Sequence, residues 1–261
     1  MDSLIFLGTG DSMGVPRVYC SCAVCTEARG TGKNARLRSS VLIQAGEEDL
    51  LIDCGPDWTR QMEQLQKREI GHVLVTHAHH DHVAGLPEWG DACRWTLKKG
   101  NVYAPADVLN DLHRRYPWLE SNLTYHDIST GFEFEGWQIQ PWKVNHGKNG
   151  HSYAYHWAKD GFKWVYCSDA ISLPDDQKNL LFELDLLILG TSFYHEEAEL
   201  ATRSVYDMVE ALELVAEVKP GRVIFTHMSH AIDMERDYGL PSNVKLARLG
   251  MQCSLLHGSP G

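Results

Sequence analysis

The 261-residue sequence has no apolar run long enough to cross a bilayer, which takes about 20 consecutive apolar residues in a helix. Its first residues, Met1 to Leu4, also lack the basic region and apolar stretch of a secretory signal. These two absences lead us to expect a soluble, cytoplasmic protein with no membrane partner.

Positive charge is also in short supply. The chain has 24 lysine and arginine residues against 35 aspartate and glutamate residues, a formal net charge of -11. A field of this sign opposes the long-range attraction of polyanions and argues against nucleic acid as a partner. A small anion held by a bound metal ion is still allowed.

Cysteine is too sparse and too uneven for a disulfide framework. Of the seven cysteines, three crowd into the segment Cys20-Ser21-Cys22-Ala23-Val24-Cys25. An odd number of thiols with this spacing suits metal ligation in a reducing compartment better than cross-linking. The alternative interpretation is three reduced cysteines in a loop.

What the chain does have is a histidine-rich motif after a predicted strand. The apolar run Gly71 to Thr76 predicts a buried strand, and the motif His77-Ala78-His79-His80-Asp81-His82 follows where it ends. Imidazoles and carboxylates are good ligands for divalent metals, and adjacent unpaired polar groups gain little in a core. The motif therefore predicts a metal site, against the alternative of a solvated histidine-rich loop.

The spacing inside this motif divides its ligands between two positions. His77 and His79 lie two residues apart on an extended strand end, so their side chains can point toward the same ion. Asp81 and His82 begin the next turn and can face a second ion. His80 fits neither pair, and we expect it in an outer or surface position.

Strands and helices alternate along the chain, which is long enough to bury a core as one α/β domain over residues 1–253, with a flexible tail over 254–261. Apolar residues at helical spacing predict helices over Trp58–Leu65, Ala106–Arg115 and Val205–Val215. Short apolar runs predict strands that include Leu4–Leu7, Val41–Ile43, Leu50–Asp53, Trp137–Val144, Ser152–Trp157, Phe162–Cys167, Leu184–Leu189 and Val223–Phe225.

Further candidate ligands stand where other apolar runs stop. His146, Asp169 and His227 each follow a predicted strand. An isolated histidine or aspartate in such a place is usually only a loop residue. Their order behind the HxHxDH motif is what gives the three residues weight together.

The HxHxDH motif followed by these three residues resembles the metallo-β-lactamase superfamily, from Leu7-Gly8-Thr9-Gly10 to Thr226-His227. The resemblance implies a four-layer αβ/βα sandwich with the site at one edge of two packed sheets. It also implies two divalent ions, manganese or zinc, that share a hydroxide nucleophile. The implied ligands are His77, His79 and His146 for one ion, Asp81, His82 and His227 for the other, and Asp169 as the bridge.

The thiolate segment predicts a further metal, a structural zinc. Cys20, Cys22 and Cys25 supply three sulfurs, and tetrahedral zinc needs a fourth ligand from elsewhere. His230 is the candidate because it lies three residues after His227. One ring can then face the paired ions while the other turns to the thiolates.

Taken together, the motifs are similar to the phosphodiesterases that accompany carbon–phosphorus lyase in phosphonate use. The match rests on CxCxxC after Leu-Gly-Thr-Gly, on HxHxDH, and on the THxSH segment that ends at His230. It implies hydrolysis of small diesters of the 5-phosphoribosyl 1,2-cyclic phosphate type, catalytic roles for Asp81 and Asp169, and a homodimer. A quinone-cofactor biosynthesis family shares the zinc cluster, but its active-site motif is degenerate.

One position departs from that phosphodiesterase pattern. The family has a histidine at the start of the late helix, where it is expected to protonate the leaving oxygen, but the segment here reads Ala201-Thr202-Arg203-Ser204. A guanidinium at Arg203 can hold a phosphoryl oxygen but donates a proton poorly. His195 is close enough in sequence to serve as the acid, with a plain loop histidine as the alternative.

Three other functions stay open for this sequence. An RNase Z-like nuclease shares the site residues, although the acidic charge opposes it and no long glycine-rich or basic insertion offers a tRNA-gripping arm. Hydrolysis of another ester or of a thioester fits the same residues. Outside the enzymes, a metal-stabilised protein that binds a small ligand is the alternative, which a complete ligand set disfavours.

Overall fold

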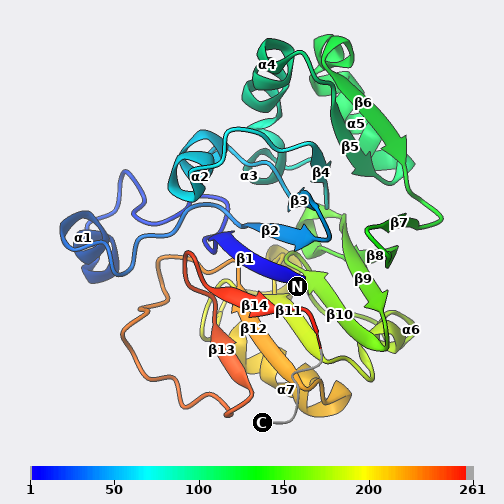
Figure 1. Cartoon of the computed structure of the whole chain (residues 1–261). Coiled ribbons are helices and arrows are strands. Elements are labelled where there is room, and N and C mark those ends of the chain that lie inside the picture. Colours follow the sequence, from blue (N-terminus) through cyan, green and yellow to red (C-terminus); the bar gives the residue numbers. More distant parts are fainter. Residues whose placement is uncertain (1, 257–261) are drawn as a thin grey trace.

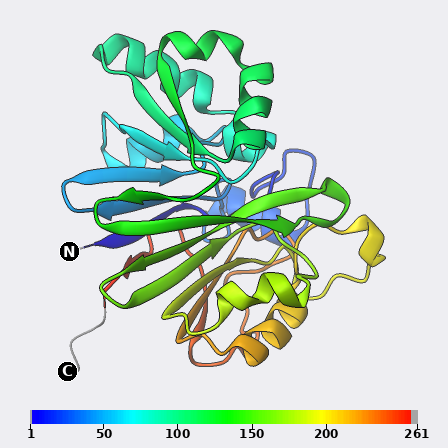
Figure 2. The same cartoon turned by 90° about the vertical axis from the view of Figure 1, so that its right-hand side faces the viewer.

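The computed structural model describes residues 2–256, and these form two β-sheets packed face to face with helices on both outer sides (Figures 1 and 2). Each sheet has seven strands within this described part of the chain. The prediction of a four-layer αβ/βα sandwich is therefore confirmed.

The N-terminal sheet has the strand order β14-β1-β2-β3-β4-β5-β6. The pairs from β14 to β3 are antiparallel and the pairs from β3 to β6 are parallel. Its strands are β1 (Ser3–Gly8), β2 (Ser40–Ala45), β3 (Glu48–Ile52), β4 (His72–Leu74), β5 (Gly100–Ala104), β6 (Leu123–Asp127) and β14 (Gln252–Ser254).

The C-terminal sheet has the order β13-β12-β11-β10-β9-β8-β7. The pairs from β7 to β10 are antiparallel and the pairs from β10 to β13 are parallel. Its strands are β7 (Phe132–Phe134), β8 (Trp137–Asn145), β9 (His151–Lys159), β10 (Phe162–Cys167), β11 (Leu186–Gly190), β12 (Arg222–Thr226) and β13 (Val244–Leu246).

Helices cover the outer faces of both sheets. Those near the N-terminal sheet are α2 (Trp58–Leu65), α3 (His80–Val83), α4 (Leu86–Thr96), α5 (Ala106–Arg115) and the 3-10 helix η1 (Pro117–Ser121). Those near the C-terminal sheet are α6 (Asp175–Lys178), α7 (Met208–Val218) and the 3-10 helices η2 (Gly147–Asn149), η3 (Asn179–Leu181) and η4 (Leu200–Thr202). Helix α1 (Ala23–Gly30) projects from the sandwich on a long loop (Figure 1).

The main core lies between the two sheets. Leu4 and Ile43 from the N-terminal sheet join Trp157 and Trp164 from the other sheet, and all four are fully buried. The two indole rings stack with centroids 4.8 Å apart. Every residue of β11 is buried, as the near-continuous apolar run of a central parallel strand requires.

Sequence patterns placed α5 correctly but put the start of α7 too early. The prediction began this helix at Val205, whereas Met208 is its first residue. Asp207 caps the helix and forms a capping box with Glu210, so the chain before it is not helical. Arg203 therefore lies before the helix, directly after η4, and not within its first turn.

Two predicted ends also differ from the structure. The strand predicted from Leu184 begins at Leu186. Ser254 is the last residue of β14 and Leu255 is fully buried, so the packed fold extends past the boundary at residue 253. Residues 257–261 of the predicted tail lie outside the described residues.

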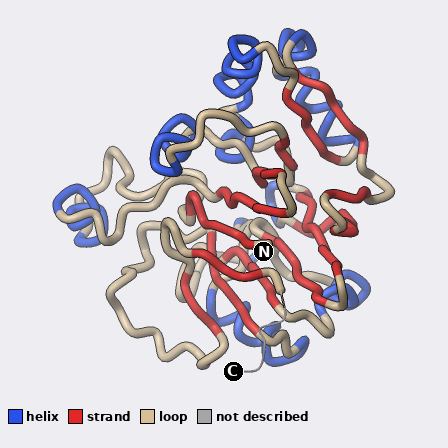
Figure 3. Tube along the Cα trace, viewed as in Figure 1, coloured by secondary structure: helices blue, strands red, loops and turns tan. Residues whose placement is uncertain are grey.

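Two long loops leave the sandwich on the same side. Figure 3 shows that the segments between β1 and β2 and between β12 and β13 are mostly loop, apart from α1. His230 in the second loop contacts Cys20 in the first, with His230 Nδ1 3.3 Å from Cys20 Sγ. Among the residues described, no helix has the length and apolar character to cross a membrane.

Candidate metal centre

The candidate ligands lie on loops that follow the carboxyl ends of strands in both sheets. β4 leads to His77 and His79 and then to α3, which carries Asp81 and His82. From the other sheet, β8, β10 and β12 lead to His146, Asp169 and His227. The structure brings all seven side chains together at one edge of the sandwich.

One group consists of three histidines. Ligand atoms of His77, His79 and His146 all lie within 4.8 Å of one another. His77 Nε2 and His79 Nδ1 are 2.8 Å apart, so these rings converge through different nitrogens. This is the set that the resemblance to the metallo-β-lactamase superfamily assigned to one ion.

A second group combines a carboxylate with two histidines. His82 Nε2 lies 3.1 Å from Asp81 Oδ2, and His227 Nε2 lies 3.6 Å from the same oxygen. The three ligand atoms are again within 4.8 Å of one another. This set matches the one assigned to the other ion.

Asp169 lies between the two groups. Its Oδ2 is 3.4 Å from His82 Nε2, and its Oδ1 is 3.7 Å from His146 Nε2 and 3.3 Å from His227 Nε2. The two oxygens of one carboxylate thus reach ligands of both groups. A bridging position is the arrangement that this geometry supports.

The donor set fits divalent cations. Among the described residues, the buried side-chain atoms without a hydrogen-bond partner include three from the candidate ligands: His82 Nε2, Asp169 Oδ2 and His227 Nε2. Buried polar atoms normally find a partner, and these three converge on one space. Imidazole and carboxylate donors around a common point are suited to zinc, manganese or iron.

Neighbouring groups fix the ring orientations. Asp53 Oδ2 lies 2.6 Å from His82 Nδ1, and His146 Nδ1 donates to the Ser204 carbonyl at 2.7 Å. Occupying Nδ1 in this way leaves Nε2 of both rings for the metal site, as in many metalloproteins.

Asp53 is a site residue that the sequence analysis missed. It is fully buried and also accepts hydrogen bonds from the backbone N–H and hydroxyl of Thr76, at 2.8 and 2.9 Å. The backbone of Asp53 has a φ of 62°, and that of the ligand His227 has a φ of 57°. Both residues are thus in the left-handed conformation, which costs a non-glycine residue about 1 kcal/mol. The signal that found the other strand-end residues, a polar side chain where an apolar run stops, could have found Asp53.

Burial and charge shift the protonation of the ligands in opposite directions. Burial lowers the pKa of His77, His79 and His146, which favours their neutral, ligating forms. Burial also disfavours charge on His82, but the neighbouring carboxylates, Asp81 foremost, outweigh it and raise the pKa of His82 well above its ordinary value. A metal ion must therefore displace a proton from this ring.

The cysteine segment forms a separate cluster. His230 Nδ1 lies 3.3 Å from Cys20 Sγ and 3.5 Å from both Cys22 Sγ and Cys25 Sγ. A tetrahedral zinc with ordinary Zn–S and Zn–N bonds would separate these atoms by about 3.5 Å. The backbone N–H of Cys25 lowers the pKa of the Cys22 thiol, which favours its thiolate. The geometry fits the predicted structural zinc.

Arg203 lies beside the site, but its guanidinium already forms hydrogen bonds with two glutamates. Its two terminal nitrogens donate to Glu210 at 2.8 and 2.6 Å, and Nε donates to Glu196 at 3.1 Å. The carbonyl of Arg203 accepts from the backbone N–H of Lys148 at 3.0 Å. Arg203 thus holds together the segment on which the loop of His146 rests.

The structure does not bring His195 into the site. Its side chain is 60% exposed, and Nδ1 lies 3.2 Å from Asp207 Oδ2 on the helix cap. It is absent from the residues that line the cavity beside the metal ligands. His80 is exposed, in agreement with the outer position expected for it.

A cavity of about 270 Å³ opens beside the candidate ligands. Besides Asp81, His146 and Asp169, it is lined by the cations Arg17 and Lys148. A larger groove of about 750 Å³ shares His79 and Asn149 with this cavity and runs along α5. The metal site therefore lies where two openings meet.

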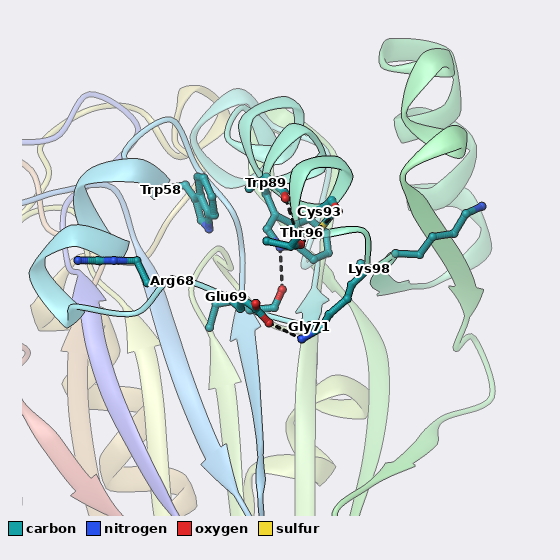
Figure 4. Close-up of a pocket in the computed structure, with 12 residues that line it drawn as sticks. Trp58, Arg68, Glu69, Gly71, Trp89, Cys93, Thr96 and Lys98 are labelled. Carbon is teal, nitrogen blue, oxygen red and sulfur yellow. Dashed lines mark hydrogen bonds and ion pairs between the residues drawn. The ribbon is translucent and has the colours of Figure 1, made fainter.

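The small cavity in Figure 4 is a different feature. It has a volume of about 50 Å³ and lies between α2, α4 and the strand starts near Gly71 and Gly100. Trp89 Nε1 donates to the Ile70 carbonyl at 2.9 Å, and Lys98 pairs with Glu69 at 2.6 Å. None of the candidate metal ligands lines this cavity, so it is not part of the metal site.

Comparison with known families gives one match over most of the chain. The model of the Beta-lactamase superfamily domain matches residues 48–228, which include HxHxDH, His146, Asp169 and His227. It ends before His230 and begins after the cysteine segment.

Curated proteins that are similar in sequence to this chain have different assigned activities. An octanoyltransferase of Porphyromonas gingivalis is 25% identical over 247 residues, which are 90% of this chain and 47% of that protein. A ribonuclease Z of Pyrococcus horikoshii is 27% identical over 165 residues, 59% of this chain and 48% of that protein. The chain thus spans about half the length of these two curated relatives.

Among solved structures, a diphosphatase from the PhnP family is similar over almost the entire chain. It shares 27% sequence identity and superposes with a TM-score of 0.86, covering 97% of this chain and 98% of that one. The likeness extends beyond the family model to the whole sandwich.

Proposed function

Because the chain belongs to the β-lactamase superfamily, we propose that it is a dinuclear metal-dependent phosphodiesterase that hydrolyses small cyclic diesters of the 5-phosphoribosyl 1,2-cyclic phosphate type. Two findings support this proposal. The chain is a hydrolase of the metallo-β-lactamase fold, and a diphosphatase of the PhnP family has a similar structure. The identity of the metals, zinc or manganese, and of the diester is part of the proposal.

The observation that carries the proposal is the position of Asp169 between two ligand groups. Its Oδ1 and Oδ2 lie within 3.7 Å of His146 and 3.4 Å of His82 respectively. Two divalent ions bound there would supply Lewis acidity toward a phosphoryl oxygen and a hydroxide nucleophile near neutral pH.

The chain's own residues hold this arrangement in place. Asp53 fixes the ring of His82, and Ser204 fixes the ring of His146, so the ligand nitrogens are oriented before substrate arrives. Asp81 and Asp169 keep negative charge at the site because nearby histidines hold the pKa of both carboxyls well below the usual range, despite burial.

Neither Arg203 nor His195 is placed to act as the proton donor, which favours a strained substrate. Arg203 is held by Glu196 and Glu210, and His195 lies outside the cavity, so neither of these two residues is placed to protonate the leaving oxygen. Opening a five-membered cyclic diester releases strain, which lessens the need for a strong acid. A cyclic diester therefore suits this site better than an unactivated linear one.

Phosphorus NMR of the manganese-loaded protein tests the proposal. 5-Phosphoribosyl 1,2-cyclic phosphate and a 2',3'-cyclic nucleotide are compared side by side. Fast, regioselective opening of the ribosyl cycle supports the proposal and a place in phosphonate breakdown. Opening of the nucleotide alone, or of neither compound, would contradict the assigned substrate.

One observation favours a second candidate, the processing of RNA ends. The groove of about 750 Å³ reaches His77 and His79 and is lined by His113, Arg114 and Arg115 on α5, and a ribonuclease Z is among the relatives. The net charge of -11 opposes binding of a polyanion. Cleavage of a precursor tRNA at physiological salt would favour this candidate over the small diester.

A further inference from the structure

The cavity beside the metal ligands is lined by three cationic side chains, and two of them are neutralised. The Arg17 guanidinium pairs with Asp11, and the Arg203 guanidinium pairs with Glu196. Both acidic partners also line the cavity. The positive charges of these two arginines are therefore balanced by acidic side chains of the protein itself.

The ammonium group of Lys148 is the exception. Within residues 2–256 it makes no ion pair and no hydrogen bond, and its side chain is exposed on the cavity wall. The remaining carboxylates of the cavity, Asp81 and Asp169, are directed at the histidine ligands. No acidic side chain is thus left in this cavity to balance Lys148.

The backbone that carries Lys148 is held firmly. Lys148 belongs to η2, directly after the candidate ligand His146, and its N–H donates to the Arg203 carbonyl at 3.0 Å. Gly147 has a φ of 56°, and a Cβ at this position would lie 2.1 Å from the same carbonyl oxygen, so only glycine permits this approach. The cation is therefore presented from a fixed point next to the metal ligands.

We propose that Lys148 determines substrate specificity by binding a second phosphate group of the substrate, a monoester remote from the diester that is cleaved. The inference rests on the proposed phosphodiesterase function. A phosphate monoester carries nearly two negative charges at neutral pH, more than a diester does, so it gains most from an unpaired ammonium. Lysine is a good point-charge ligand for such a group.

Matched substrates and variants test this role. Ribose 1,2-cyclic phosphate is compared with and without a 5-phosphate for the wild type, Lys148→Ala and Lys148→Arg. We expect Lys148→Ala to lose about 10- to 100-fold in kcat/KM on the 5-phosphorylated substrate, mainly through KM, and little on the other. Lys148→Arg should keep most of the activity because the positive charge remains.

Two outcomes of this comparison would overturn the role of Lys148. An equal loss on both substrates would show that Lys148 does not read the 5-phosphate. A Lys148→Arg variant as impaired as Lys148→Ala would show that charge is not what matters. Lys245→Ala is the matched control, because Lys245 is also exposed and lies on β13, away from this cavity.

Calorimetry separates this inference from the proposed function. Ribose 5-phosphate and ribose are titrated into the metal-loaded protein, so no turnover is needed. Binding of the phosphorylated sugar that weakens at least 10-fold in Lys148→Ala supports the inference even where neither cyclic compound is hydrolysed. Equal binding by Lys148→Ala, or no binding by the wild type, overturns the role of Lys148. Neither result affects the test of the proposed phosphodiesterase function.

Discussion

His227 and His230 lie on one turn, three residues apart, and their rings face two different ligand clusters. His227 Nε2 is 3.3 Å from Asp169 Oδ1, whereas His230 Nδ1 is within 3.5 Å of the three cysteine sulfurs. Between them, the N–H of Met228 donates to the Thr9 carbonyl at 2.8 Å and ties the turn to the end of β1. The two clusters are thus mechanically connected.

Replacing His230 with alanine should therefore affect both clusters. We expect loss of the structural zinc and about 10-fold weaker metal binding at the paired site, because the turn that positions His227 loses one anchor. Metal analysis after dialysis measures both effects. Cys93→Ser is the control, since Cys93 is a free cysteine outside both clusters. Unchanged affinity at the paired site in a zinc-free variant would contradict the connection.

Asp53→Asn tests the support of His82. The amide cannot supply the negative charge that faces His82 Nδ1 at 2.6 Å, so we expect metal affinity to fall about 10- to 100-fold. A chelator titration that monitors bound metal measures this. Asp49→Asn is the control: Asp49 lies on β3, the strand that Asp53 follows, but it pairs with Lys67, so this variant should leave metal affinity unchanged. Equal affinities in both variants would rule out the role of Asp53.

Asp169→Ala removes the carboxylate that reaches both ligand groups. We expect turnover to fall to background and bound metal to fall by at least one ion per chain, because no other carboxylate within residues 2–256 pairs with both His82 and His146. Elemental analysis and the phosphorus NMR assay are run on the same sample. Retained activity with full metal content would exclude the bridging position.

Arg203 and His195 should respond differently to alanine. Arg203→Ala leaves Glu196 and Glu210 without their partner, and we expect it to lower the free energy of unfolding by about 3 kcal/mol, measured by urea denaturation.

His195→Ala should keep turnover within about twofold of the wild type, because the ring lies outside the cavity. A large loss of kcat in His195→Ala would restore this residue as the proton donor.

Metal binding should weaken as the pH falls. The carboxylates raise the pKa of His82 above its ordinary value, so in the metal-free protein this group contributes stability at low pH that is lost as the pH rises through the raised pKa. A metal ion competes with that proton, and apparent affinity should drop by about tenfold per pH unit for one displaced proton. Thermal unfolding with and without manganese, at about pH 8 and about pH 6, measures the difference. A shift in Tm independent of pH would contradict it.

Some residues of the candidate site could be predicted from the sequence, and others could not. Four candidate ligands are visible because HxHxDH places them side by side on one loop. His146, Asp169 and His227 lie far apart in the sequence, and only their order relative to a known superfamily distinguished them from ordinary loop residues. Asp53 also follows an apolar run, but an isolated aspartate there looks like any turn residue.

The environment of Arg203 could not be predicted for a different reason. Its partners Glu196 and Glu210 are each seven residues away, one before η4 and the other in the first turn of α7. Charge alone does not tell whether an arginine faces a substrate or two glutamates, because that depends on where α7 begins. The assigned ligand roles, the structural zinc and the homodimer remain predictions.

The paired site is divided between the two halves of the sandwich. The loop after β4 and the helix α3 that follows it supply His77, His79, Asp81 and His82, and the loops after β8, β10 and β12 supply the other three candidate ligands. Contacts of such long sequence separation require the closure of long loops, which slows folding. Neither half alone carries all seven candidate ligands, so metal uptake during refolding would report when the two sheets pack against each other.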